Sequence, residues 1–137
     1  LMKRRHDLLA QYDAISTNGS ASLPALLALA NLEKIRRHAP AMAETARQVD
    51  RMFGRLAEEF PGRVESAQGR GYLAGLKFRA VEDAVQFHRR ALAAGLWTRV
   101  HAYHPGHRTV LTKLGLLTDG AIVEFLHRQC RELLANA

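Results

Sequence analysis

A loop rich in small hydroxyl side chains is the first feature of the sequence that could do chemistry. It reads Ser16-Thr17-Asn18-Gly19-Ser20 and lies just ahead of a segment expected to be helical. Hydroxyl groups and free backbone N–H groups next to a helix N-terminus suit a phosphate. The same composition is also typical of an ordinary loop and helix cap. From the residues alone, both interpretations stay open.

A glycine-rich turn is the second candidate. Gly69-Arg70-Gly71-Tyr72-Leu73-Ala74 matches the dinucleotide-binding pattern G-x-G-x-x-A. That pattern needs a helix after the glycines, because the helix N-terminus meets the pyrophosphate. Here the following residues predict a strand, so we expect a tight turn with glycines at positive φ. Gly75 is expected to allow a close approach to that strand.

Three histidines, His101, His104 and His107, are spaced as H-x2-H-x2-H. Zinc sites often use paired histidines. Pro105 and Gly106 prevent the three from sharing a helical face, and no acidic residue or cysteine lies nearby to complete a site. We therefore expect loop histidines and no metal site.

The composition is that of a globular chain. Apolar residues make up 47% of the 137 residues, enough for one domain with a core. No apolar run reaches the roughly 18 residues of a membrane span. The single cysteine, Cys130, lies in an amphipathic pattern and is expected to be a packed thiol.

The net charge of +7 raises the question of nucleic-acid binding, but the basic residues are scattered among glutamates, as on solvated helix faces. We expect a cytoplasmic chain that binds neither nucleic acid nor membrane.

The hydrophobic pattern predicts the order helix, helix, strand, strand, helix, strand, strand, helix. The first helix is expected from Ser22 to about Arg37, apolar nearly all round as in a buried helix, and the second from Pro40 to about Phe60. Thr118 is expected to cap the last helix. The residues expected on its inward face are Ile122, Phe125, Leu126, Gln129 and Leu133. This order describes an α+β fold, a small and mostly antiparallel sheet with packed helices.

Three runs of sequence carry a resemblance to a known family. The run from Thr17 to Leu29 is similar to a segment that reads T-F-G-G-N-P-L-A before an alanine-rich helix, and the run from Gly69 to Phe78 is similar to R-G-x-G-L-x-x-G-I-E-L. Arg108–Leu114 and Leu117–Asp119 are similar to a closing strand and the start of a last helix. In this order, the three resemble the class III aminotransferases, which depend on pyridoxal 5'-phosphate (PLP). The resemblance implies the C-terminal small domain of fold-type I PLP-dependent transferases.

The resemblance also implies domains, a cofactor and a partner. Residues 1–38 would be a loop and buried helix from the end of the large PLP domain, and residues 39–137 the small domain. The family forms homodimers with PLP at the subunit interface. Its threonine in the first run reaches the PLP phosphate of the neighbouring subunit; Thr17 is the match here, with Ser16 and Asn18 beside it. The family's Schiff-base lysine and pyridine-nitrogen aspartate precede the matching region, and nothing in residues 1–16 fits them. We therefore expect a fragment, inactive alone, of an enzyme that transfers an amino group between an amino donor and an oxo acid or aldehyde.

The closing strand departs from the family pattern. The family often has an arginine there that binds a substrate carboxylate, and the ungapped match places Thr112 at that position with Lys113 beside it. Lysine supplies the charge but not the bidentate geometry of arginine. Gly115-Leu116 replaces a common proline pair. The substrate therefore stays open. A lactam-forming, mutase or decarboxylase relative is one alternative, and a stand-alone basic nucleic-acid-binding α+β module is another.

Overall fold

The computed structural model describes residues 22–100, 104 and 107–136. The chain divides into two compact units, residues 1–37 and residues 38–137. The described part of the first unit, residues 22–37, is helical. The second unit holds a four-stranded sheet and the remaining helices.

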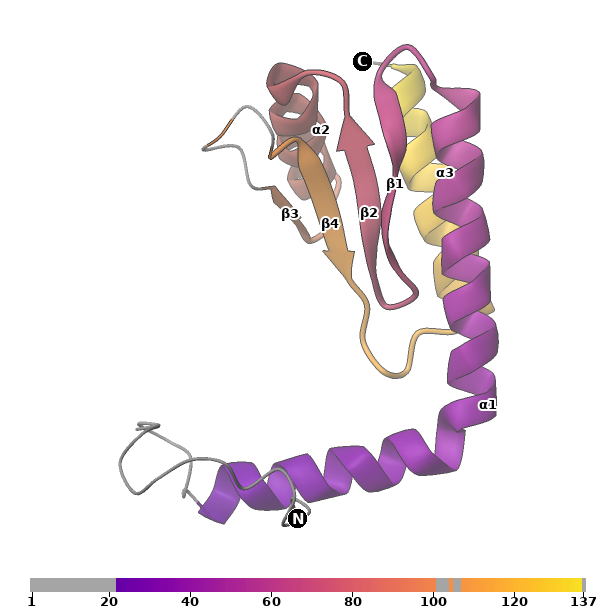
Figure 1. Ribbon diagram of the computed structural model, residues 1–137, viewed down its shortest axis with the longest axis vertical. Helices are drawn as coiled ribbons and strands as arrows, with labels where there is room; N and C mark the ends of the chain where they lie inside the picture. Colours follow the sequence, from indigo (N-terminus) through magenta and orange to yellow (C-terminus); the bar gives the residue numbers. More distant parts are fainter. Residues whose placement is uncertain (1–21, 101–103, 105–106, 137) are drawn as a thin grey trace, which may run out of the picture. The chain divides into compact units, whose positions relative to one another are not determined.

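Helix α1 extends from Ser22 to Glu59 and contains Pro40 (Figure 1). The prediction of two separate helices here is wrong. A proline inside a helix removes one N–H donor and crowds the carbonyl group four residues earlier, which bends or weakens the helix locally. Helical hydrogen bonding nevertheless continues on both sides of it. The boundary between the two units falls between Arg37 and His38, within one turn of this proline.

The part of α1 before Arg37 is apolar nearly all round, as expected, but its large side chains are exposed. The exposed leucines are Leu23, Leu26, Leu27, Leu29 and Leu32. In the part of α1 that belongs to the second unit, by contrast, Val49, Phe53 and Leu56 are all buried.

The sheet is antiparallel throughout, as the α+β prediction requires. Its strands are β1 (Val64–Arg70), β2 (Leu73–Phe78), β3 (Thr98–Val100) and β4 (Thr109–Lys113). They lie in the order β1-β2-β4-β3, so β4 enters between β2 and β3. Helix α2 (Val81–Ala93) connects β2 to β3, and α3 (Gly120–Ala135) follows β4.

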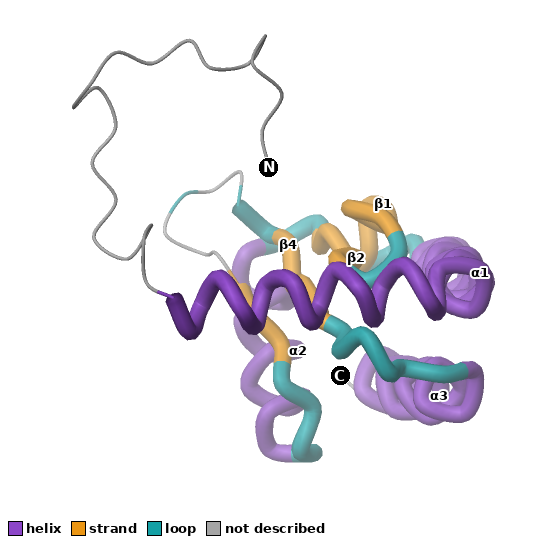
Figure 2. Tube along the Cα trace, turned by 90° about the horizontal axis from the view of Figure 1, so that it is seen from below, coloured by secondary structure: helices purple, strands orange, loops and turns teal. Residues whose placement is uncertain are grey.

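The helices of the second unit lie on one face of the sheet. Figure 2 shows α2, α3 and the C-terminal half of α1 on the same side of the strands. Successive side chains of a strand alternate between faces, and on β2 Ala74, Leu76 and Phe78 are buried toward these helices. Phe87 of α2 packs on Phe78 with ring centroids 5.2 Å apart. We call the opposite side, which none of these helices covers, the open face.

The last helix begins one residue later than predicted and presents a different side to the core. Asp119, not Thr118, is its N-cap, because the Asp119 side chain accepts a hydrogen bond from the Ile122 N–H at 3.0 Å. Of the predicted inward residues, Leu126 is buried, whereas Ile122 and Phe125 are nearly half exposed. The buried residues are Val123, Leu126, Cys130 and Leu134. Their spacing of three, four and four is a regular helical stripe.

Candidate functional site

The glycine turn joins β1 to β2 and has the predicted backbone. Gly69 and Gly71 have φ values of +78° and +53°. The Gly71 N–H donates to an Asp50 carboxylate oxygen of α1 at 2.6 Å. Strand β2 follows the turn directly, without the helix that a pyrophosphate site requires. The turn therefore fixes the strands and does not offer a dinucleotide site.

Gly75 lies in β2 where β4 comes closest, which confirms the expected close approach. A Cβ atom at this position would lie 1.9 Å from the Val110 carbonyl oxygen. Gly75 pairs with Leu111 in the register of the two strands. The absence of a side chain at Gly75 thus sets the spacing between β2 and β4, and with it the position of the residues near the end of β4.

The residues predicted for the PLP phosphate, Ser16, Thr17 and Asn18, lie outside the described residues, and their role stays a prediction. His101 also lies outside the described residues. His104 and His107 lie edge to face with ring centroids 5.3 Å apart. Within the described residues, no group of three histidine, cysteine, aspartate or glutamate side chains is placed to hold a metal ion.

Thr112 and Lys113, the two residues predicted to bind substrate, point to opposite faces of the sheet. Thr112 is buried on the helix side, and its hydroxyl donates to the Ala74 carbonyl oxygen at 2.9 Å. Lys113 is exposed at the end of β4. Alternation along the strand puts Leu111 on the same face as Lys113. A substrate role for either residue stays a prediction, but only Lys113 is placed to meet a soluble ligand.

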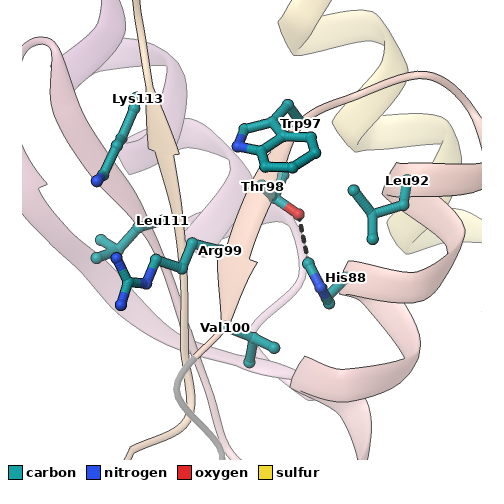
Figure 3. A pocket seen from close by; sticks show the side chains of 8 residues that line it. All are labelled: His88, Leu92, Trp97, Thr98, Arg99, Val100, Leu111 and Lys113. Carbon is teal, nitrogen blue, oxygen red and sulfur yellow. Dashed lines mark hydrogen bonds between the residues drawn. The ribbon is translucent and has the colours of Figure 1, made fainter.

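Lys113 lines a cavity of about 470 Å³ along the edge strand β3 (Figure 3). The residues that line it are His88, Leu92, Trp97, Thr98, Arg99, Val100, Leu111 and Lys113. The Thr98 hydroxyl and the His88 Nδ1 atom share a hydrogen bond of 2.7 Å on the helix side of β3. In Figure 3, Arg99 and Lys113 extend to the same side of the two strands, with Leu111 between them.

Sequence reasoning missed Trp97 and Arg99 as companions of Lys113. The β3–β4 register pairs Arg99 with Leu111 and Thr98 with Thr112. Trp97 directly precedes β3 and therefore lies near Lys113 at this end of the two strands, and Arg99 shares the face of Lys113 by alternation. The alternation itself can be read from the sequence. The register that joins the two strands cannot, because a connection of eight residues separates them.

A second charged group lies at the far end of the sheet. Glu65 accepts from Lys77 Nζ at 2.5 Å and from Arg108 at 3.0 Å. The hydrogen bond from Lys77 is the main cause that lowers the pKa of the Glu65 carboxyl, with a smaller contribution from the charge of Arg108. This group is a closed ion-pair network, in contrast to the cations beside β3.

Parts of solved aminotransferase structures have the same fold as this chain. A transaminase obtained by directed evolution through ancestral reconstruction matches with a TM-score of 0.72 and 20% identity, over 92% of this chain and 30% of that one. A Bacillus anthracis aminotransferase matches with a TM-score of 0.70 and 19% identity, over 92% of this chain and 31% of that one. The lysine aminotransferase of M. tuberculosis, in its internal aldimine form, matches with a TM-score of 0.64 and 19% identity, over 77% of this chain and 24% of that one.

The chain thus has an aminotransferase-like α+β fold and spans less than a third of the length of these structures. No protein-family model and no curated protein matches it. No helix among the described residues is long and apolar enough to cross a membrane.

Proposed function

We propose that this chain is the C-terminal part of a PLP-dependent class III aminotransferase. The observation that carries the proposal is the backbone match to a transaminase over 92% of the chain. In this proposal, residues 1–38 belong to the end of the large PLP domain and the interface, and residues 39–137 form the small domain. The parent enzyme is a cytoplasmic homodimer that transfers an amino group between an amino donor and an oxo acid or aldehyde.

The described residues do not make a PLP site by themselves. The cavity beside β3 holds one lysine, Lys113, but no acidic side chain lines it to pair with a pyridine nitrogen. Lys77 forms an ion pair with Glu65 and does not line this cavity. The proposal therefore places the Schiff-base lysine in the remainder of the parent enzyme, and the chain alone is inactive. No step of the reaction is assigned to the described residues.

Two roles are proposed for this chain in the parent. The hydroxyl groups of Ser16 and Thr17 and the neighbouring N–H groups, with Asn18, bind the PLP phosphate of the neighbouring subunit. Lys113 supplies a positive charge for a substrate carboxylate. PLP, when bound, supplies an electron sink for the reacting amine.

The decisive experiment uses the complete gene product. Its absorption spectrum with PLP should show an imine band, and borohydride should label a lysine that precedes Leu1. Absence of the band and of the label refutes the proposal. In the same protein, Thr17→Ala should weaken PLP retention, and unchanged affinity would count against the phosphate role. Turnover of candidate amines then separates a transaminase from a mutase or decarboxylase of the same fold.

A further inference from the structure

A tryptophan stands almost free of protein contacts at the edge of the sheet. Trp97, the only tryptophan in the chain, is 81% exposed and borders the cavity beside β3. An indole normally buries a large apolar area, so a ring left this open loses much of that stabilisation. Leu92 and Leu111 line the same cavity from opposite sides of β3 (Figure 3). The cavity thus combines a flat aromatic surface with apolar side chains from α2 and from β4.

Two cations accompany this surface without a compensating acid. Arg99 and Lys113, which line the same cavity as Trp97, lie on the open face, and neither side chain forms a hydrogen bond or ion pair in the described part of the chain. None of the described residues that line the cavity is acidic. Glu65, at the other end of β2, is already engaged by Lys77 and Arg108. The cavity therefore has a net positive charge that a ligand anion would neutralise.

The register brings the two cations to a suitable separation. Arg99 is directly opposite Leu111, which is two residues from Lys113 on the same strand. Diagonal neighbours of this kind lie about 7–8 Å apart at their backbones, so long side chains can converge on one group between them. A guanidinium and an ammonium group together suit a carboxylate, with the guanidinium giving paired hydrogen bonds.

We propose that the cavity beside β3 binds a small aromatic carboxylate, with its ring on Trp97 and its carboxylate between Arg99 and Lys113. The volume of about 470 Å³ is of the size that holds a single-ring acid. Taken as the substrate of the parent enzyme, such an acid would be an aromatic amino or oxo acid, and in that respect the inference rests on the proposed function. Binding itself needs only this chain.

The test uses the full 137-residue chain and one reporter. Because Trp97 is the only tryptophan, its indole N–H gives a single resonance in a ¹H–¹⁵N spectrum. The probe is 3-phenylpropionate, which cannot undergo amino transfer. We expect a saturable shift with a dissociation constant of about 1–10 mM, since drug-sized ligands gain about 0.3 kcal/mol per heavy atom. Propionate, which lacks the ring, and 3-phenylpropan-1-ol, which lacks the charge, should each bind about tenfold more weakly, as expected from losing about 1.4 kcal/mol.

Matched variants separate the site from general charge. Arg99→Gln and Lys113→Gln should each weaken binding of 3-phenylpropionate about fivefold or more, since each removes a charge-assisted hydrogen bond. Arg55→Gln removes one positive charge on α1, outside the cavity, and should leave binding unchanged. Far-ultraviolet circular dichroism confirms that each variant is folded.

Several results would overturn the inference. They are a Trp97 resonance that does not saturate up to the solubility limit of the acid, equal binding of acid and alcohol, or equal weakening by Arg55→Gln and Arg99→Gln. Tighter, strongly salt-dependent binding of a single-stranded oligonucleotide at Trp97 would replace it with a nucleic-acid surface. A complete gene product that forms no imine would refute the proposed function and leave this binding result standing. Conversely, failure of the chain to bind the acid would refute this inference and leave the proposed function standing.

Discussion

The close approach of β2 and β4 at Gly75 makes a sharp prediction for the variant Gly75→Ala. The added methyl carbon would lie 1.9 Å from the Val110 carbonyl oxygen and 2.8 Å from the Leu111 Cα atom, whereas such contacts essentially never fall below 3.0 Å. Both obstructing atoms belong to the backbone of β4, so no side-chain rotation relieves the contact. The two strands must separate locally by roughly 1 Å, in an interior packed as closely as a crystal.

The expected cost follows from this displacement. Overpacking of a core typically costs about 1–3 kcal/mol and occasionally more. A clash with backbone in the centre of the sheet belongs at the upper end, so we expect the free energy of unfolding to fall by about 3 kcal/mol. For a domain of this size, each kcal/mol lowers the melting temperature by about 4–8 °C. The expected fall in Tm is therefore about 12–24 °C.

Urea unfolding followed by circular dichroism measures this change directly. Gly54→Ala is the matched control, because Gly54 lies in α1 with no atom within 4 Å of the added carbon. Alanine is favoured over glycine in a helix by about 1 kcal/mol, so this control should be neutral or stabilised. If Gly75→Ala is as stable as the wild type, β2 and β4 do not approach each other as described, and the position assigned to Lys113 fails with them.

Three further predictions concern the cap of α3, an ion pair and the cysteine. Asp119→Ala should lower the free energy of unfolding by about 1 kcal/mol because it removes the bond to the Ile122 N–H, whereas Thr118→Ala should change it little; the reverse order in thermal melts would restore Thr118 as the cap. The Lys77 hydrogen bond lowers the pKa of Glu65 in the folded chain. The stability that this ion pair contributes should therefore be present above the ordinary pKa of 4.5 and lost as the pH falls through the lowered pKa. Glu65→Gln should make the free energy of unfolding depend less on pH in this acidic range, and an unchanged dependence would contradict the pairing. Burial raises the pKa of the Cys130 thiol to about 12, so a thiol reagent at pH 8 should label it only after unfolding; rapid labelling of the folded chain would show that α3 does not pack Cys130 against the core.

The sequence predicted most of the fold, because most of its signals are local. Glycine pairs, prolines and alternating apolar residues mark the turns and strands, and the predicted glycine conformations at Gly69 and Gly71 are confirmed. The inward side of α3 was wrong by about one position, because large apolar residues were preferred to smaller ones. The core instead selects Val123 and Cys130 and leaves Ile122 and Phe125 at the surface.

The error at Pro40 and the residues that were missed beside Lys113 have a different origin. Whether a proline ends a helix or only bends it depends on what packs around it, and the local sequence does not predict that packing. Likewise, the group formed by Trp97, Arg99 and Lys113 exists only because β3 and β4 pair in one particular register. Thr112 is named because the resemblance places it at the family's arginine position, and Lys113 because it is the next residue, yet adjacent strand residues face opposite ways.

The position of β4 in the sheet bears on how the chain is made. Strands β2 and β3 are complete well before β4 is synthesised, yet neither pairs with the other, and each of them bonds to β4. During translation, β2 therefore keeps one unpaired edge, and β3 has no partner, until Lys113 has left the ribosome. Unpaired strand edges invite association with other chains. A nascent or truncated product that ends before Thr109 should be prone to aggregation, and a separately supplied peptide spanning β4 and α3 would be the segment able to close the sheet.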